Sequence, residues 1–201
     1  MNATEPPGGK KSGSSKIRTF IAVKLPDPVI RMVAGWQQEL KRHALRIKWT
    51  RPENIHLTLK FLGDIATEDV APVCAAVDTS IRGLPPMTLC AKGVGVFPGI
   101  RQARVLWTGI SGETDLLANV HQAIDVGLRP LGFALEQRRF KGHLTLGRFK
   151  GRADADILID VMKTYAAMVS DEFRVTTVYV IKSDLKPSGP LYTDLSRIQL
   201  V

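Results

Sequence analysis

One tetrapeptide, His-Leu-Thr-Leu, occurs twice in this sequence, at residues 56–59 and again at residues 143–146. Both copies lie in segments rich in β-branched and alternating apolar residues, which is typical of β-strands. Because successive side chains of a strand point to opposite faces, His56 shares a face with Thr58, and His143 shares one with Thr145. Each copy is therefore predicted to place an imidazole and a hydroxyl side by side, with its leucines facing a core.

A single copy of this tetrapeptide would describe an ordinary half-buried strand. Two identical copies suggest two similar halves, each of which contributes one strand to a shared cleft. A metal centre is not predicted, because two histidines without nearby carboxylate or cysteine ligands are too few. A serine–histidine–aspartate triad is not predicted either, since the sequence offers no matching nucleophile and acid.

Phosphoryl transfer fits two imidazoles and two hydroxyls better. In-line displacement needs a base on one side of phosphorus and an acid on the other, and histidine titrates near neutrality, so that one imidazole can start neutral and the other protonated. The hydroxyls of Thr58 and Thr145 can donate hydrogen bonds to the non-bridging oxygens, where negative charge builds up. His56 and His143 are therefore the candidate catalytic residues.

Two cations close to the motifs could also contact phosphate. Lys60 follows His56 by four residues, so a regular strand would put both on one face, although a solvated lysine explains it equally well. Arg148 follows His143 by five residues, so a regular strand would put it on the opposite face from His143. A bulge at Gly147 could turn Arg148 toward the cleft, where its planar guanidinium would suit phosphate.

The remaining pattern predicts an α+β fold with antiparallel sheets, because strands come in pairs with single helices between them. Strands are expected at Arg18–Leu25, Arg46–Thr50, Ile55–Leu62, Met87–Phe97, Ala103–Ile110, Phe133–Phe140, His143–Phe149, Phe173–Ser183 and Tyr192–Gln199. Helices are expected at Val29–His43, Thr67–Arg82, Glu113–Leu131 and Asp154–Met168. The other two histidines, His43 and His121, fall in these helices and are expected to be exposed and idle.

Composition narrows the class of protein further. The 201 residues are 44% hydrophobic, with no apolar run long enough to span a membrane and no glycine-rich phosphate loop. Residues 1–16 are poor in apolar groups, so we expect a disordered extension without a secretory signal. The two cysteines predict no disulfide framework, and we expect a cytoplasmic protein.

The formal net charge is +9, and its excess is uneven. A basic zone, defined as residues 129–152, holds seven Lys and Arg residues against one acid, Glu136. Such a zone attracts polyanions and makes nucleic-acid binding depend on salt. A solvated basic face without a partner remains an equally good interpretation of the charge alone.

The two motifs resemble those of the 2H phosphoesterase superfamily, which carries two H-x-T/S-x motifs. The sequence is most similar to its RNA 2′,3′-cyclic phosphodiesterases, also called 2′–5′ RNA ligases. The resemblance covers roughly Lys16 to Val201 and extends to RTFIAVKLP (18–26), WTRPENIHLTLKFLG (49–63), RVLW (104–107) and SDLKPSGPLY (183–192). One departure is Gly142, which stands where the family often has proline and predicts a looser start to the second motif's strand.

The resemblance implies one bilobed domain over residues 17–201, with two pseudo-symmetric halves, each with an antiparallel sheet and helices, around an active-site groove. It implies hydrolysis of 2′,3′-cyclic phosphate ends of RNA to 2′-phosphates without a cofactor or a metal. His56 would be the proton donor and His143 the proton acceptor, while Thr58, Thr145 and Arg148 would bind the phosphate. Reverse 2′–5′ ligation is implied as well, and we expect a monomer that acts on RNA ends.

Two other functions remain open on the sequence alone. Another reaction of the same superfamily would act on small cyclic nucleotides, an ADP-ribose cyclic phosphate or 2′–5′ oligonucleotides. A non-catalytic RNA-binding module is the third possibility, and its binding would survive the loss of both histidines. A groove that uses the basic zone should favour oligonucleotides and show a salt-sensitive KM.

Overall fold

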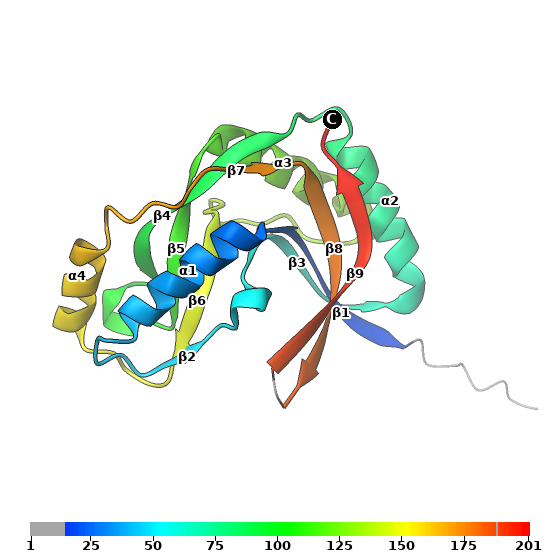
Figure 1. Ribbon diagram of the computed structural model, residues 1–201. Helices are drawn as coiled ribbons and strands as arrows, with labels where there is room; N and C mark the ends of the chain where they lie inside the picture. The colour runs from blue at the N-terminus through cyan, green and yellow to red at the C-terminus, as the bar shows by residue number, and fades with distance from the viewer. Residues whose placement is uncertain (1–14, 188) are drawn as a thin grey trace, which may run out of the picture.

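The computed structural model describes residues 15–187 and 189–201, which form one nine-stranded antiparallel sheet (Figure 1). Its strands are β1 (Lys16–Lys24), β2 (Ile47–Trp49), β3 (His56–Ala66), β4 (Met87–Phe97), β5 (Val105–Gly112), β6 (His143–Phe149), β7 (Phe173–Val175), β8 (Thr177–Lys186) and β9 (Gly189–Gln199). They run in the order β7-β4-β5-β6-β3-β1-β8-β9, and β2 pairs with β6. The predicted α+β class is therefore confirmed.

Helices connect the strands and cover the curved sheet. The α-helices are α1 (Asp27–Leu40), α2 (Val70–Ile81), α3 (Thr114–Gly127) and α4 (Ala155–Thr164), and the 3-10 turns are η1 (Pro52–Asn54), η2 (Thr67–Asp69), η3 (Ile100–Gln102) and η4 (Arg129–Leu131). Helix α1 buries Val29, Val33, Trp36 and Leu40, whose spacing of three and four residues creates one apolar stripe. Helix α4 begins after Asp154, whose carboxylate accepts hydrogen bonds from two backbone amides of its first turn.

The two motif strands, β3 and β6, meet at the centre of the sheet. Only Leu57 and Leu144 are in register between them, so the two halves join edge to edge at this seam. The seam leucines are fully buried in a core that draws side chains from all four α-helices. The helices therefore cover the leucine face of β3 and β6, and the histidine face is left for the site.

One predicted strand is wrong. Residues 133–140 form an irregular connection instead, because most of their side chains are exposed and two tertiary contacts replace strand pairing. Lys60 Nζ donates to Ala134 O at 2.9 Å, and the Glu136 amide donates to Asp125 Oδ2 at 2.9 Å. The predicted helix at residues 113–131 also ends early, at Gly127, and is followed by the turn η4.

The predicted N-terminal extension lies outside the described residues up to residue 14. Its last two residues are described: Ser15 accepts a hydrogen bond from the Thr67 amide, and Lys16 begins β1 opposite Ala66. Within the described part of the chain, no helix is both long and apolar enough to cross a membrane.

Candidate active site

The two motifs come together across the central seam of the sheet. Because β3 and β6 are antiparallel and Leu57 faces Leu144, His56 lies beside Thr145, and Thr58 lies beside His143. The histidines are close enough for the charge of His143 to act on His56. Each imidazole therefore also lies beside the hydroxyl of the other motif, an arrangement that occurs twice and follows the pseudo-symmetry of the halves.

Each histidine is anchored through the same ring nitrogen. His56 Nδ1 lies 2.8 Å from Asn54 O, and His143 Nδ1 lies 2.8 Å from Lys141 O, in both cases the carbonyl two residues earlier. A carbonyl can only accept, so Nδ1 must donate in both rings. The other nitrogen, Nε2, is therefore the one available to exchange a proton with a substrate.

Aromatic side chains fix the planes of both imidazoles. The His56 ring lies 4.7 Å from Phe20 and 5.3 Å from Tyr192, measured between ring centroids. The His143 ring lies 4.9 Å from Phe97 and 6.3 Å from Trp107. Rings held between two aromatic neighbours have little freedom to rotate, which aims both Nε2 atoms in defined directions.

Both histidines are held toward their neutral form. Burial lowers the pKa of His56, the hydrogen bond to Asn54 raises it in part, and the charge of His143 lowers it again. Burial also lowers the pKa of His143, its bond to Lys141 O opposes this, and the Lys141 and Arg148 charges lower the pKa further. Of the two, His143 is the one next to fixed cations.

A bulge follows each motif at the same place. Register shifts leave Leu59 of β3 unpaired with β1, and leave Leu146 of β6 unpaired with β5. The extra residue shifts the alternation of side chains between the two faces by one position. The fifth residue after each histidine therefore points to the same face as the histidine. These residues are Arg148 in β6, as predicted, and Phe61 in β3.

The β6 bulge is stabilised from the helix side. Gln37 of α1 is almost fully buried, and its Nε2 donates to Leu146 O and to Thr50 O, both at 2.8 Å. Gly147 lets β2 approach, because a Cβ there would lie 2.4 Å from a methyl carbon of Ile47. Sequence reasoning missed Gln37, although it shares a helix face with Val33 and Leu40.

The bulge in β3 overturns the prediction for Lys60. Its side chain lies on the helix side, where it forms a buried ion pair with Asp125 of α3 instead of facing the groove or the solvent. His43 and His121 are half-buried, so the prediction that they are exposed is wrong, although neither of them lines the groove. His121 stacks on Phe140 at 4.1 Å, and His43 Nε2 lies 3.0 Å from the Tyr165 hydroxyl.

Gly142 does not loosen the start of β6, as its sequence position had suggested. A Cβ at this residue would lie 3.0 Å from Leu117 and 3.5 Å from both Ile110 and Leu57, so the backbone is closely packed. The strand that carries His143 therefore begins from a firmly held position.

A groove of about 660 Å³ opens on the histidine face, between β1, β3, β6 and the β8–β9 hairpin, whose tip projects from the body in Figure 1. His56, Thr58, Thr145 and Arg148 line it, while His143 is not among its lining residues. Phe61 is 66% exposed in this groove. The structure therefore gathers four of the five predicted site residues around one groove and places His143 beside them.

The groove is strongly cationic. Its lining includes Arg18, Lys48, Arg51 and Arg148, and no acidic residue among those described. None of these four cations forms an ion pair within the described chain, whereas Lys24, also next to the site, is bound to Asp194. Of the seven Lys and Arg residues in the basic zone, only Arg148 lines the groove. The described residues contain no group of three or more His, Cys, Asp or Glu suited to a metal ion.

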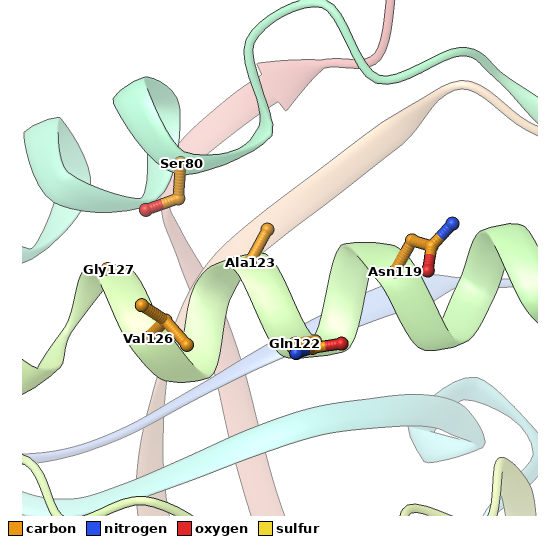
Figure 2. A pocket seen from close by; sticks show the side chains of 6 residues that line it. All are labelled: Ser80, Asn119, Gln122, Ala123, Val126 and Gly127. Atoms are coloured by element: carbon orange, nitrogen blue, oxygen red, sulfur yellow. The ribbon is translucent and has the colours of Figure 1, made fainter.

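A second, shallower depression lies between α2 and α3 (Figure 2). It is lined by Ser80, Asn119, Gln122, Ala123, Val126 and Gly127. A Cβ on Gly127 would lie 1.7 Å from Ser80 Oγ, so this glycine allows the two helices to approach each other. The depression has no charged lining residue and no side chain suited to acid–base chemistry, which separates it from the groove.

The curved antiparallel sheet and the paired histidine motifs define the class of two-histidine phosphoesterases. The chain belongs to the LigT-like phosphoesterase family, which matches it twice, over residues 23–107 and 109–192. Each match contains one motif, in agreement with the two pseudo-symmetric halves. Membership of this family makes the protein a hydrolase that acts on phosphodiester bonds.

Named relatives agree with this class. RNA 2′,3′-cyclic phosphodiesterase of Methanothermobacter thermautotrophicus is 33% identical over 92% of this chain and 100% of its own length. The protein of the same name from Archaeoglobus fulgidus is 34% identical over 89% of this chain and 98% of its own. The crystal structure of TT0787 from Thermus thermophilus superposes with a TM-score of 0.74 at 26% identity, covering 92% of this chain and 98% of its own.

Proposed function

We propose that this protein hydrolyses 2′,3′-cyclic phosphate ends of RNA to 2′-phosphates, with His56 and His143 as acid and base. The observation that carries the proposal is the pair of histidines on neighbouring strands, each tied to a carbonyl through Nδ1 and each beside a threonine of the other motif. The archaeal relatives named RNA 2′,3′-cyclic phosphodiesterases support the choice of substrate.

In this mechanism His143 is the base. It lies beside Lys141 and Arg148, whose charges favour its neutral form. Its Nε2 takes a proton from water as the water oxygen attacks phosphorus. The bond from phosphorus to O3′ breaks on the opposite side, and protonated His56 Nε2 gives its proton to O3′. The product carries a 2′-phosphate and a 3′-hydroxyl.

The other groove residues stabilise the substrate and the transition state. Thr58 and Thr145 donate hydrogen bonds to the non-bridging oxygens, and Arg148 neutralises the charge that develops there. The exposed ring of Phe61 offers a face on which the terminal base can stack, a contact that every base can make. With the 5′-hydroxyl of another RNA as the nucleophile in place of water, the same displacement would form a 2′–5′ phosphodiester bond, break the bond from phosphorus to O3′ and so give 2′–5′ ligation.

The test uses an RNA oligonucleotide with a 2′,3′-cyclic phosphate end in excess EDTA, and product ends are identified by mass and by phosphatase sensitivity. We expect the wild type to form only 2′-phosphate. His56→Ala and His143→Ala should each lower kcat by about 10²–10⁴-fold, the usual contribution of one proton transfer. His43→Ala is the matched control, since that histidine contacts Tyr165 outside the groove.

Three results would contradict the proposal in different ways. Activity on small cyclic nucleotides alone would indicate another reaction of the same superfamily. RNA binding without turnover, retained in the double histidine variant, would indicate a binding module. Loss of activity in EDTA, restored by a divalent ion, would mean that the two histidines do not suffice.

A further inference from the structure

The groove carries more positive charge than one cyclic phosphate requires. A cyclic phosphodiester has a single negative charge, and Arg148 already lies beside the motif, with Lys48 directly across from it on β2. Arg18 and Arg51 add two further guanidiniums to the same lining, and neither forms an ion pair within the described chain. Unpaired guanidiniums in an acid-free groove are suited to additional phosphate groups.

Arg18 extends the groove along β1. It lies two residues before Phe20 on the same strand face, beyond the ring that packs on His56. Asp64 lies opposite it in β3, but the two side chains form no ion pair. Thr19 pairs with Lys182 of β8, and Tyr192 of β9 pairs with Ser183, so Arg18 and Tyr192 line neighbouring parts of the groove.

Arg51 stands at the hairpin end of the groove. It precedes η1, and its Nε would lie 3.8 Å from a Cβ built on Gly189, the first residue of β9. Asn54 of η1 donates through Nδ2 to Pro190 O at 3.0 Å, which ties this turn to the hairpin. The backbone that carries Arg51 is therefore fixed against β9.

The proposed reaction determines on which side of the phosphorus atom the RNA strand lies in the groove. If His56 protonates O3′, the ribose of the terminal nucleotide lies on the His56 side of phosphorus, and water attacks from the His143 side. Most of the groove lining comes from β1, β3 and the β8–β9 hairpin, which lie on the His56 side of the central seam, so the groove extends on the ribose side. The RNA strand on the 5′ side of that ribose must leave through this same space.

We propose that Arg18 and Arg51 form a second phosphate subsite, which binds the phosphodiester group on the 5′ side of the terminal nucleotide. The groove thus favours an oligonucleotide end over a free nucleoside cyclic phosphate. This inference rests on the proposed function, because it uses the assignment of His56 to O3′. It also places the strand outside most of the basic zone, since Arg148 is the only Lys or Arg of that zone that lines the groove.

The experiment compares adenosine 2′,3′-cyclic phosphate with the dinucleotide ApA bearing the same cyclic end. Wild type, Arg18→Ala, Arg51→Ala and Arg139→Ala are assayed on both. We expect wild-type kcat/KM to be at least about tenfold higher for the dinucleotide, and each groove variant to reduce that ratio about tenfold, as one charged hydrogen bond would. Arg139 is exposed in the basic zone outside the groove and should leave the ratio intact.

The salt dependence gives a second readout that a folding defect would not change in this way. The slope of log kcat/KM for the dinucleotide against log salt should become shallower by about 0.7 for each phosphate contact removed. Equal wild-type activity on the two substrates, or equal losses on both in the groove variants, would overturn the subsite while the proposed function stands. Loss of the dinucleotide advantage in Arg139→Ala would instead assign the strand to the basic zone. Hydrolysis of neither substrate would reject the proposed function itself.

Discussion

The two histidines occupy matching but unequal surroundings, and this inequality is what acid–base catalysis requires. Both donate from Nδ1 to a backbone carbonyl, and both are wedged between aromatic rings. They differ in their charged neighbours, because Lys141 and Arg148 act on His143 while the main charge on His56 is His143 itself. The fixed cations beside His143 favour its role as the neutral base.

These surroundings predict the pH profile. Burial lowers the pKa of both histidines, so the bell-shaped profile of kcat/KM should be centred below about pH 6.5, the ordinary pKa of imidazole. In the profile of kcat, the bound phosphate anion favours protonated His56 and moves the alkaline limb to higher pH. A pH-independent rate would rule out paired histidine catalysis.

A variant of Lys141 tests whether the acid limb of the pH profile reports the titration of His143. Lys141→Met removes a positive charge that lowers the pKa of His143, so the acid limb should move to higher pH. The sign follows because protonation of the base stops the reaction, and a raised pKa brings that protonation at a higher pH. Lys150→Met is the matched control, since Lys150 is exposed and is not among the charges acting on His143. The limbs belong to the coupled pair, so both should be fitted together.

Among the elements, the motif strands were predictable and their bulges were only partly so. The predicted strand His143–Phe149 has the bounds of β6 as observed, because buried Leu144 and Leu146 alternate with the less buried His143 and Thr145. Gly147 marked a break, and Arg148 turned toward the groove as expected. Nothing in the residues after His56 marks the bulge at Leu59, so Lys60 was assigned to the wrong face of the strand.

The connection at residues 133–140 shows a different limit of sequence reasoning. Its pattern resembled a strand, but the partners that satisfy its backbone are a lysine of β3 and an aspartate of α3, both distant in the sequence. Tertiary hydrogen bonds of this kind leave no local signal, because Lys60 and Asp125 are ordinary surface residue types. The groove cations Arg18 and Arg51 were missed for the same reason, since only the folded chain brings them together.

Helix α1 provides a test of how the β6 bulge is maintained. Gln37→Leu removes both hydrogen bonds and leaves the half-buried Thr50 carbonyl without this partner, which should cost about 1–3 kcal/mol of stability. A bulge that shifts also moves Arg148, so kcat/KM should fall about tenfold or more even at temperatures where the variant is fully folded. Chemical denaturation and steady-state kinetics measure the two effects.

Gln38→Leu is the matched control for that experiment. Gln38 is the exposed neighbour on the same helix, and its amide oxygen accepts a long hydrogen bond from Lys41, at 3.4 Å. We expect this control to retain both stability and activity. A Gln37 variant that loses stability but keeps full kcat/KM would show that the bulge does not depend on this side chain.

The whole molecule is built from two halves that exchange elements. Strand β2, from the first half of the sequence, pairs with β6 of the second, and β8, from the second half, pairs with β1 of the first. Helix α1 likewise reaches β6 through Gln37. The buried core runs without interruption across the seam, where Leu57 and Leu144 are both fully buried. Neither half could keep its core if the other unfolded.

We therefore expect one cooperative unfolding transition, with equal calorimetric and van't Hoff enthalpies. Leu144→Ala removes a seam side chain and should cost about 2–5 kcal/mol, which moves the whole transition down by roughly 5–15 °C without splitting it. Leu191→Ala is the control, because that leucine is 56% exposed. Tryptophan fluorescence and far-UV circular dichroism should coincide in both variants. Two separate transitions would mean that the halves fold independently. The same conclusion would follow if the Leu144 variant showed a lowered transition by only one of the two methods. The seam would then serve only to bring the two histidines together.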